Sequence, residues 1–293
     1  MKVCIVSHDA GGAENVAAYL AAQNEMETLF VLAGPAIKVF ERRMGDIKIA
    51  DLEEAIAACD WCLCGTGWQS DLEWKAIASA HKAGKRTIAF LDHWVNYRER
   101  FTRNGQEVLP DEIWVADEYA KKMAEQIFPD LIIKQQQDRR LEMLNSEIKS
   151  LEIEQPAHGF THILYVLEPI REAWGLLEKP GEFMALDYFI EHKDRLDLCA
   201  DLLIRIRPHP SDPAEKYDQW IDCHGDSNIS ITVDSCSSLA ESIAWSDIVV
   251  GCQTYAMVIA LAAGKQVVSS IPDWAPPCVL PQPEIIRLAD LAV

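Results

Sequence analysis

The chain has 293 residues, which is enough for one large domain or for two domains of ordinary size. Its formal net charge of -19 argues against DNA or RNA as a partner, because affinity for a phosphate backbone comes from clustered Lys and Arg. No apolar run reaches the roughly 20 residues that a membrane span needs, so we expect no integral membrane segment. The composition predicts a soluble globular protein in which an anion would need a local basic pocket.

The beginning of the chain and its cysteines bear on compartment and metal binding. Met1 and Lys2 lead directly into an apolar stretch that is typical of a buried strand and unlike a secretion signal, so we expect a cytoplasmic protein. Cys59, Cys62 and Cys64 lie close together, but no second Cys or His pair has the spacing of a zinc finger. We interpret them as buried structural thiols, with a metal site as the alternative.

Short apolar runs rich in β-forming residues alternate with helix-length segments along most of the chain. Such alternation favours parallel sheets that helices cover on both faces. The expected strands lie within 2–8, 28–34, 61–67, 86–93, 112–118, 162–169, 202–209, 229–234, 247–253 and 266–271, and the clearest helices at 51–58, 70–83, 182–195 and 255–263.

The alternation is interrupted once, by a polar stretch that lacks β-forming runs. We interpret residues 131–158 as a flexible linker between two domains, 1–130 and 159–293, and we expect 134–155 to be the most mobile part of the chain. The fold class predicted is α/β, with two Rossmann-like, doubly wound domains that face each other across a cleft. The alternative is a helical excursion within a single sheet.

Apolar residues recur at helical spacing within this linker. Leu141, Leu144, Ile148 and Leu151 are separated by three, four and three positions, which indicates an amphipathic helix. This stripe could pair two copies of the chain as a homodimer.

The first strand is followed by His8, Asp9, Gly11 and Gly12. Ligands of doubly wound sheets bind outside the carboxyl ends of the strands, which makes all four candidate site residues. The glycines permit close approach of a backbone or ligand beside a helix amino end, although the dinucleotide fingerprint lacks its third glycine. Asp9 is a candidate catalytic carboxylate, or alternatively a helix cap.

Two other strand ends of the amino-terminal half carry polar or aromatic residues. Ser70 and Glu73 have the spacing of a capping box, which explains them without a function, and Trp68 before them could stack on a sugar ring or pack in the core. Asp92 and His93 follow a later strand, and an adjacent carboxylate and imidazole suit general base catalysis. Asp92 could instead cap the next helix.

A cluster of cationic residues ends a strand in the second half. Arg205 and Arg207 alternate with isoleucines, so a strand places both arginines on one face. Pro208 and Pro210 stiffen the turn that follows and hold His209 between them. This arrangement suits an anionic ligand such as a phosphate; the alternative is a proline turn after a strand with solvated arginines.

Two neighbouring strand ends point to the same ligand. Glu168 follows the first strand of the second half, and Thr254 opens a helix whose amides and hydroxyl form a natural phosphate cradle. We therefore expect Glu168, Arg207, His209 and Thr254 to converge at one edge of a sheet.

The segments RPHP, at 207–210, and SLAESIAWSDIVVGCQTYAMVIALAAGK, at 238–265, resemble the nucleotide-binding half of GT-B glycosyltransferases. They are similar to families with CMP- or CDP-activated donors: bacterial sialyltransferases, Kdo transferases and CDP-glycerol glycerophosphotransferases. In these families a His-Pro histidine and a later Ser/Thr hydroxyl bind the donor phosphate, which implies such roles for His209 with Pro210 and for Thr254. The resemblance covers 160–272; the amino half matches only in architecture.

The resemblance implies a metal-independent glycosyltransferase without a cofactor. It would move a sugar from a nucleotide-sugar, of CMP or CDP type, to a saccharide or glycolipid acceptor in polysaccharide or cell-envelope synthesis. From chemistry alone, Asp92 or else Asp9, with His93 nearby, would deprotonate the acceptor, and the phosphate-binding groups would stabilise the leaving nucleotide. The alternatives are a nucleotide-sugar hydrolase or epimerase, and a non-catalytic subunit that binds nucleotide-sugars.

Overall fold

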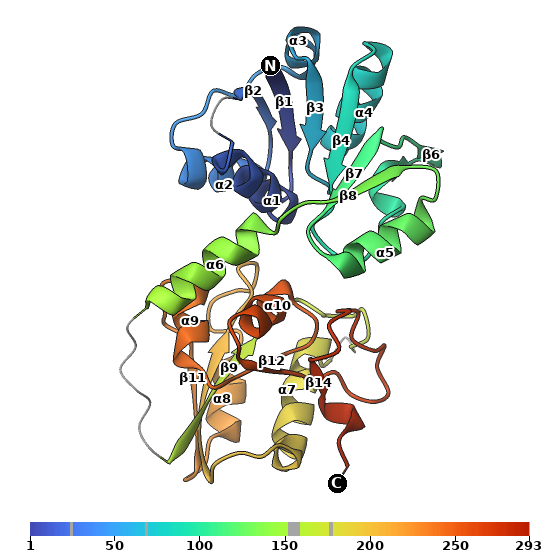
Figure 1. Cartoon of the computed structure of the whole chain (residues 1–293). Coiled ribbons are helices and arrows are strands. Elements are labelled where there is room, and N and C mark those ends of the chain that lie inside the picture. The colour runs from blue at the N-terminus through green and yellow to red at the C-terminus, as the bar shows by residue number, and fades with distance from the viewer. Residues whose placement is uncertain (24–25, 68–69, 152–158, 176–177, 293) are drawn as a thin grey trace. The chain divides into compact units, whose positions relative to one another are not determined.

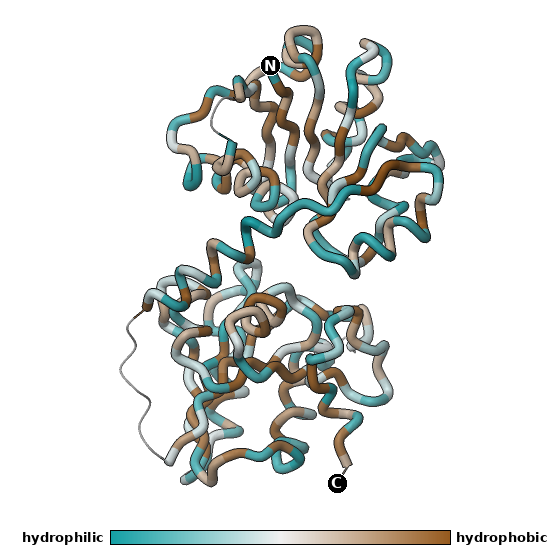
Figure 2. The backbone as a smooth tube through the Cα atoms, in the orientation of Figure 1, coloured by the Kyte–Doolittle hydropathy of each residue, from teal (hydrophilic) through white to brown (hydrophobic). Residues whose placement is uncertain are grey.

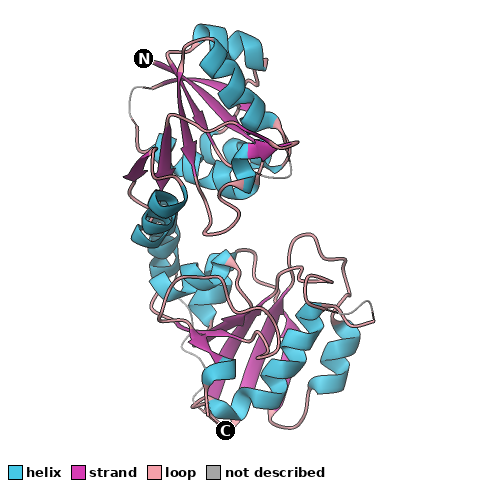
Figure 3. Ribbon diagram, turned by 90° about the vertical axis from the view of Figure 1, so that its right-hand side faces the viewer, coloured by secondary structure: helices cyan, strands magenta, loops and turns pink. Residues whose placement is uncertain are grey.

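The chain forms two compact units, Met1–Glu142 and Met143–Val293, each built around one six-stranded sheet (Figure 1). Helices pack against the strands of both sheets (Figure 3), which confirms the prediction of an α/β protein with two doubly wound, Rossmann-like domains. The computed structural model describes residues 1–23, 26–67, 70–151, 159–175 and 178–292.

The first unit is a parallel sheet with helices between its strands. Its strand order is β2-β1-β3-β4-β7-β8, so the order reverses between β1 and β3, and ligands of such sheets bind at the carboxyl edge beside this reversal. The elements are β1 (Lys2–Ser7), α1 (Ala10–Ala21), β2 (Glu27–Leu32), α2 (Pro35–Met44), α3 (Leu52–Ala58), β3 (Trp61–Cys64), α4 (Leu72–Lys82), β4 (Arg86–Phe90), the 3-10 turn η1 (Glu99–Phe101), the hairpin β5 (Thr102–Arg103) and β6 (Gln106–Glu107), β7 (Glu112–Val115), α5 (Glu118–Ile127) and β8 (Ile132–Gln135).

The strands of this sheet are apolar because helices cover both of their faces (Figure 2). On one face Val3 and Ile5 of β1 pack with α1 and α2 in a cluster that also contains Trp114. The alternate residue of β1, Cys4, is buried on the other side, opposite Cys62 of β3. The period-two alternation of the strand therefore separates a bulky aliphatic and aromatic layer from a layer of small thiols.

The first sheet extends further along the chain than the sequence indicates. β8 pairs with β7 through Gln135, although residues 131–158 are predicted to form a flexible linker. The pairing is stabilised by Glu112 on β7, whose buried carboxylate accepts from Arg86 Nη2 at 2.5 Å and from Lys134 Nζ at 2.9 Å. One carboxylate thus joins three neighbouring strands, which accounts for a polar segment forming an edge strand.

The rest of the predicted linker is partly helical. The amphipathic helix expected from its leucine spacing is present as α6 (Arg139–Ser150), in which Ile148 is buried. Asn145 Nδ2 donates to the carbonyl of Ala262 at 3.0 Å. Residues 152–155 of the stretch 134–155, which the sequence predicts to be the most mobile, lie outside the described part of the chain. That mobility stays a prediction, as does the homodimer.

The second unit repeats the doubly wound architecture. Its order is β11-β10-β9-β12-β13-β14, with the reversal between β9 and β12, and its paired strands are parallel. The elements are β9 (Phe160–Val166), α7 (Gly181–His192), η2 (Lys193–Arg195), β10 (Asp201–Arg207), α8 (Asp218–His224), β11 (Ile229–Val233), α9 (Leu239–Trp245), β12 (Ile248–Gly251), α10 (Tyr255–Ala262), β13 (Gln266–Ser269), β14 (Ile286–Arg287) and η3 (Leu288–Asp290).

Alternation along β10 sets the two faces of the second sheet. Ile204 and Ile206 belong to the apolar cluster that Phe189 of α7 and Trp220 of α8 also enter. Arg205 has the opposite orientation, and its guanidinium lies 3.8 Å from the ring centroid of Trp245 in α9. Across the described ranges, no helix has the length and apolar character needed to cross a membrane.

Replacing Glu112 with Gln should weaken the dependence of stability on acid pH. Burial would raise the pKa of Glu112, but hydrogen bonds from Trp114, Lys134 and Arg86 outweigh it and hold the pKa below its ordinary value. The ionised carboxylate therefore stabilises the fold above about pH 4.3, and this contribution disappears as the pH falls through the lower folded value. In urea unfolding measured at several acid pH values, the difference in the free energy of unfolding between Glu112→Gln and wild type should shrink as the pH falls.

Glu125, whose side chain is 52% exposed, provides the control. Glu125→Gln should follow the wild-type pH profile. If Glu112→Gln changes the free energy of unfolding by the same amount at every pH, the role assigned to the carboxylate is contradicted.

Candidate functional site

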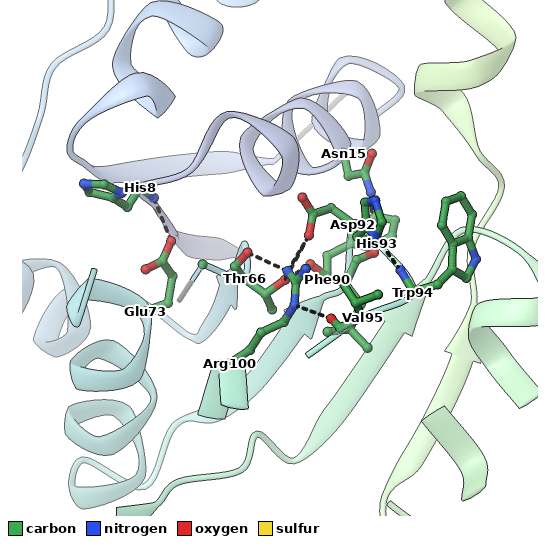
Figure 4. Close-up of polar contacts among 12 residues, drawn as sticks. His8, Asn15, Thr66, Glu73, Phe90, Asp92, His93, Trp94, Val95 and Arg100 are labelled. Atoms are coloured by element: carbon green, nitrogen blue, oxygen red, sulfur yellow. Dashed lines mark hydrogen bonds and ion pairs between the residues drawn. The ribbon is translucent and has the colours of Figure 1, made fainter. Parts of the chain in front are cut away.

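A buried arginine holds the carboxyl edge of the first sheet together (Figure 4). Arg100 is 7% exposed, and its Nη1 donates to Asp92 Oδ1 at 2.5 Å and to Thr66 Oγ1 at 2.9 Å. Because Thr66 follows β3 and Asp92 follows β4, this guanidinium joins two neighbouring strand ends. The carboxylate of Asp92 thus takes part in an ion pair, and not in the helix cap considered as its alternative role.

Gly11 and Gly12 pack against the same two strand ends. A Cβ atom at Gly11 would overlap with Asp92 Oδ2, and a Cβ atom at Gly12 would lie 2.8 Å from the backbone nitrogen of Thr66. Contacts within the protein therefore explain why glycine stands at both positions. Ligand contact by these glycines stays a prediction.

His8 and Asp9 form a hydrogen-bonded pair after β1, with His8 Nδ1 2.7 Å from Asp9 Oδ1. An ionised carboxylate only accepts hydrogen bonds, so Nδ1 carries the proton and Nε2 is left as the basic nitrogen. Asp9 has the N-cap position of α1, but its side chain makes no capping hydrogen bond there. Its contact favours the chemical interpretation of Asp9 over the capping one.

The predicted capping box of Ser70 and Glu73 is wrong. α4 begins at Leu72, whose N–H donates to Ser70 Oγ at 3.1 Å, while Glu73 Oε1 accepts from the N–H of His8 at 2.7 Å (Figure 4). Glu73 is 4% exposed, and burial raises its pKa to about 7. At neutral pH this carboxyl can therefore exchange a proton next to the His8–Asp9 pair.

His93 lies on the same edge as a neutral imidazole. Its Nδ1 accepts from the N–H of Trp94 at 3.0 Å. Burial lowers the pKa of His93 despite the opposite effect of Asp92, and the positive charges of Arg100 and Arg140 act in the same direction as burial. Trp68, which the sequence suggests as a stacking ring, lies outside the described residues.

In the second unit, the structure gives Arg207 a different partner from the predicted phosphate. Its Nη1 donates to Asp234 Oδ2 at 2.6 Å and to Ser242 Oγ at 2.9 Å. The ion pair compensates the charge of Arg207 on the face that α9 covers. These contacts do not support the predicted role of Arg207 in phosphate binding.

His209 occupies the tight turn that its flanking prolines predict. The N–H of Asp212 donates to the His209 carbonyl at 2.8 Å, and the N–H of Ser211 donates to His209 Nδ1 at 3.2 Å. Burial lowers the pKa of His209 despite the opposite effect of Asp212, and the charges of Arg171 and Lys216 act in the same direction as burial. The imidazole is therefore neutral, with its Nε2–H available as a donor.

A buried charge network joins the turn of His209 to the loop after β9. Lys216 Nζ lies 2.6 Å from Glu182 Oε1 and 2.7 Å from Asp212 Oδ1. Glu182 Oε2 accepts from the N–H of Arg171 at 2.6 Å, and Asp212 Oδ2 accepts from the N–H of His209 at 3.1 Å. The network fixes the positions of Arg171 and His209 relative to each other.

Arg171 has a constrained backbone and an exposed side chain. Its φ of 50° lies in the left-handed region, which is unfavourable for residues other than glycine, and its carbonyl accepts from Gly181 N at 2.8 Å. Hydrogen bonds at both the N–H and the carbonyl of Arg171 thus hold its backbone in place. This constraint directs a guanidinium to the surface near His209.

Glu168 and Thr254 complete this edge. Burial raises the pKa of Glu168 to about 7, against the effect of a hydrogen bond from the Gln253 backbone. Thr254 caps α10, because its Oγ1 accepts from the N–H of Ala256 at 3.5 Å, and the hydroxyl proton remains available as a donor.

Strand order shows how these groups are spaced. His209, Glu168 and Thr254 follow β10, β9 and β12, which are adjacent in the sheet. Parallel strands lie about 4.8 Å apart, so the outer two strand ends are separated by about 10 Å. The edge therefore offers donors on either side of a carboxyl group, as the sequence predicts for Glu168, His209 and Thr254.

The thiols are buried, as the sequence interpretation proposed. Cys59, Cys62 and Cys64 are each at most 1% exposed, and the sulfurs of Cys62 and Cys64 lie 3.6 Å apart. Within the described ranges, no group of three or more His, Cys, Asp or Glu side chains is arranged to hold a metal ion.

Sequence reasoning missed the residues that position this site. Glu182, Asp212, Lys216 and Arg171 belong to no recognisable motif. The contacts among them exist because the fold brings the loops after β9 and β10 together. The single sequence signal is the acidic residue three positions after His209.

Comparisons with solved structures show the fold. A protein from Listeria monocytogenes assigned as a UDP-N-acetylglucosamine 2-epimerase has a TM-score of 0.63 and 16% identity, over 94% of this chain and 80% of that one. The UDP-N-acetylglucosamine 2-epimerase of Neisseria meningitidis has a TM-score of 0.58 and 12% identity, over 92% of this chain and 82% of that one. Staphylococcus aureus MnaA, solved with UDP, has a TM-score of 0.58 and 13% identity, over 92% of this chain and 79% of that one.

These similarities place the chain in the GT-B-like, Rossmann-type fold class. No protein-family model and no curated protein sequence matches the chain significantly. The fold is therefore established by structure, and the narrower resemblance to CMP- and CDP-donor families stays a prediction.

Replacing Lys216 with Met should destabilise the protein by about 3 to 5 kcal/mol, because two buried carboxylates would lose their cation. Chemical denaturation measures this change. Lys179→Met is the control, since Lys179 pairs with Asp187 through a side chain that is 52% exposed, and such surface pairs contribute about 1 kcal/mol or less.

A further variant separates the charge effect from a loss of packing. Adding Glu182→Gln and Asp212→Asn to Lys216→Met should recover part of the lost stability. If Lys216→Met costs no more than Lys179→Met, the network does not hold the edge together.

Proposed function

We propose that the protein is an enzyme that acts on a nucleotide-activated sugar, and that glycosyl transfer is its reaction. The observation that carries the proposal is the pairing of Arg171 and His209 by one buried charge network at the carboxyl edge, beside the amino end of α10. In a chain with a net charge of -19, a guanidinium, an imidazole N–H and helix amides gathered at one edge favour a phosphate ligand.

The second unit would bind the donor. His209 Nε2–H, the Arg171 guanidinium and the Thr254 hydroxyl would donate to the phosphates and stabilise the charge that grows on the leaving nucleotide. Compared with the sequence prediction, Arg171 replaces Arg207, since the Asp234 ion pair already compensates the Arg207 charge.

The first unit would supply the general base. Asp92 is engaged in an ion pair with Arg100 and its side chain is 15% exposed, whereas the side chains of His8 and Asp9 are each 23% exposed. We therefore place Asp9 with His8 before Asp92 as the base that accepts the acceptor hydroxyl proton. The saccharide or glycolipid acceptor, the CMP or CDP donor type, the absence of a cofactor and the cytoplasmic compartment stay predictions.

A second candidate reaction is epimerisation or hydrolysis of the nucleotide-sugar. It is favoured by the names of two similar solved structures and by Glu73 and Glu168, two carboxyl groups whose pKa values burial raises to about 7. Such groups can accept and return a proton at neutral pH. A third candidate, a subunit that binds nucleotide-sugars without turnover, has no specific observation in its favour.

Nucleotide binding tests the donor site. In a thermal-shift and calorimetry panel of CMP, CDP, UDP and ADP, a nucleotide at 100 times its dissociation constant should stabilise the fold by about 2.7 kcal/mol. His209→Ala and Arg171→Ala should each weaken that binding by about 10-fold or more, because each removes a donor to the phosphates.

His192 at the end of α7 serves as the control, since it lies at the opposite end of its helix from the loop that carries Arg171. His192→Ala should leave the affinity unchanged. A wild-type protein that binds none of these nucleotides would refute the proposal.

Turnover in heavy water separates the two reactions. With an acceptor panel of simple glycosides, a glycosyltransferase should release nucleotide only when acceptor is present and should incorporate no deuterium at carbon. Asp9→Asn should lower kcat by about 100-fold or more while nucleotide affinity is retained. Acceptor-free formation of a deuterated sugar epimer would select the second candidate instead.

A further inference from the structure

Two tryptophans meet at the carboxyl edge of the second sheet. Trp174 lies in the loop after β9, and Trp274 lies in the loop after β13. Their ring centroids are 5.8 Å apart and their planes make an angle of 75°, so the rings form the two walls of a corner. Since β9 and β13 flank β12, the two loops leave the sheet on either side of the strand that leads to Thr254.

The outer wall of this corner is exposed. Trp274 is 56% exposed, the largest fraction among the tryptophans that the structure describes, whereas Trp61, Trp94 and Trp114 are at most 8% exposed. A ligand that covered this ring would remove apolar surface from water, which is favourable. The indole also keeps an N–H that can donate to a polar ligand.

Contacts within the protein hold the Trp174 ring and the backbone of the Trp274 loop. A Cβ atom at Gly181 would lie 3.2 Å from Trp174 Cε3, so the Trp174 ring packs against the first turn of α7. The Trp274 loop is closed by a hydrogen bond from Ala275 N to the Pro272 carbonyl at 3.1 Å. Farther along this loop, Val279 N donates to Gln253 Oε1 at 3.3 Å, which ties the loop to the residue before Thr254.

We propose that Trp174 and Trp274 bind the sugar ring of the nucleotide-sugar. The inference rests on the proposed function and names the group that this edge recognises. A pyranose chair has apolar C–H groups on its faces and at its rim, so it can contact two rings at a wide angle. A flat nucleobase stacks best on one ring or between two parallel rings.

Polar groups next to the corner suit the hydroxyls of such a ring. Glu168 follows β9 and Gln253 follows β12, so both lie at the same edge of the sheet as the loops of Trp174 and Trp274. The side-chain oxygen of Gln253 contacts the Trp274 loop through the N–H of Val279. The site favours pyranoses with equatorial hydroxyls, because these leave C–H bonds on the ring faces.

Calorimetry on the full chain compares bare nucleotides with their sugar-bearing forms: UDP with UDP-glucose and UDP-N-acetylglucosamine, ADP with ADP-glucose, and CMP with CMP-N-acetylneuraminate. For the pair that wild type binds, Trp274→Ala should lower the affinity for the sugar-bearing form by about 10-fold and change the affinity for the bare nucleotide by no more than about twofold. Trp274→Phe should keep the affinity for the sugar-bearing form within about threefold of wild type, since an aromatic ring remains. Phe160→Ala, at a 38% exposed aromatic residue on the amino end of β9, is the matched control and should change neither affinity.

The outcomes separate this inference from the function on which it rests. If wild type binds none of the bare or sugar-bearing nucleotides, both are overturned. If wild type binds them but Trp274→Ala weakens both forms equally, the ring contacts the base and the inference is overturned while the function stands. Unchanged affinity of Trp274→Ala for every sugar-bearing form overturns it in the same way.

Discussion

Lys216 lies between two carboxylates that have almost no contact with water, and the candidate site of the second unit depends on this arrangement. Glu182 is 1% exposed, and the side chain of Asp212 is fully buried. Isolated buried charges are strongly unfavourable, so the three groups must stay together for any of them to remain ionised. Because the loops after β9 and β10 each contribute a carboxylate or a backbone N–H to this cluster, they cannot move independently. Two surface segments thereby acquire the rigidity that binding an anion requires.

The first unit also has a buried cation that joins two loops. There the guanidinium of Arg100 donates hydrogen bonds to oxygen atoms of Thr66 and Asp92 at two strand ends. The consequence for chemistry differs between the units. In the first unit the ion pair occupies the carboxylate that the sequence singles out, and Asp9 is left as the more available base. In the second unit the network engages backbone groups of Arg171 and His209, so their side chains stay available to a ligand.

The sequence was sufficient for the fold and for part of the site, because period-two and helical patterns report burial directly. It placed Glu168, His209 and Thr254 at strand ends that prove adjacent, since parallel strands end at one edge. It failed where side-chain partners decide the role. Arg207 shares a face with Arg205 as predicted, yet its partner Asp234 directly follows the neighbouring strand β11 and carries no local signal. The spacing of Ser70 and Glu73 matches a cap, but the tertiary contact with His8 prevails. β8 was missed because it is only four residues long and because Glu112, the partner of its Lys134, belongs to the neighbouring strand.

The layer of thiols between the first sheet and its helices has a consequence for handling the protein. Cys4, Cys59, Cys62 and Cys64 are all buried, and hydrogen bonding to Cys62 together with burial raises the pKa of Cys4. Thiolates are the reactive form, so these sulfurs resist alkylation and oxidation while the unit is folded. Cys199 and Cys223, the exposed cysteines, both belong to the second unit. A maleimide dye would therefore label the second unit first. The slower labelling of the buried cysteines in the first unit would measure the rate at which its core opens.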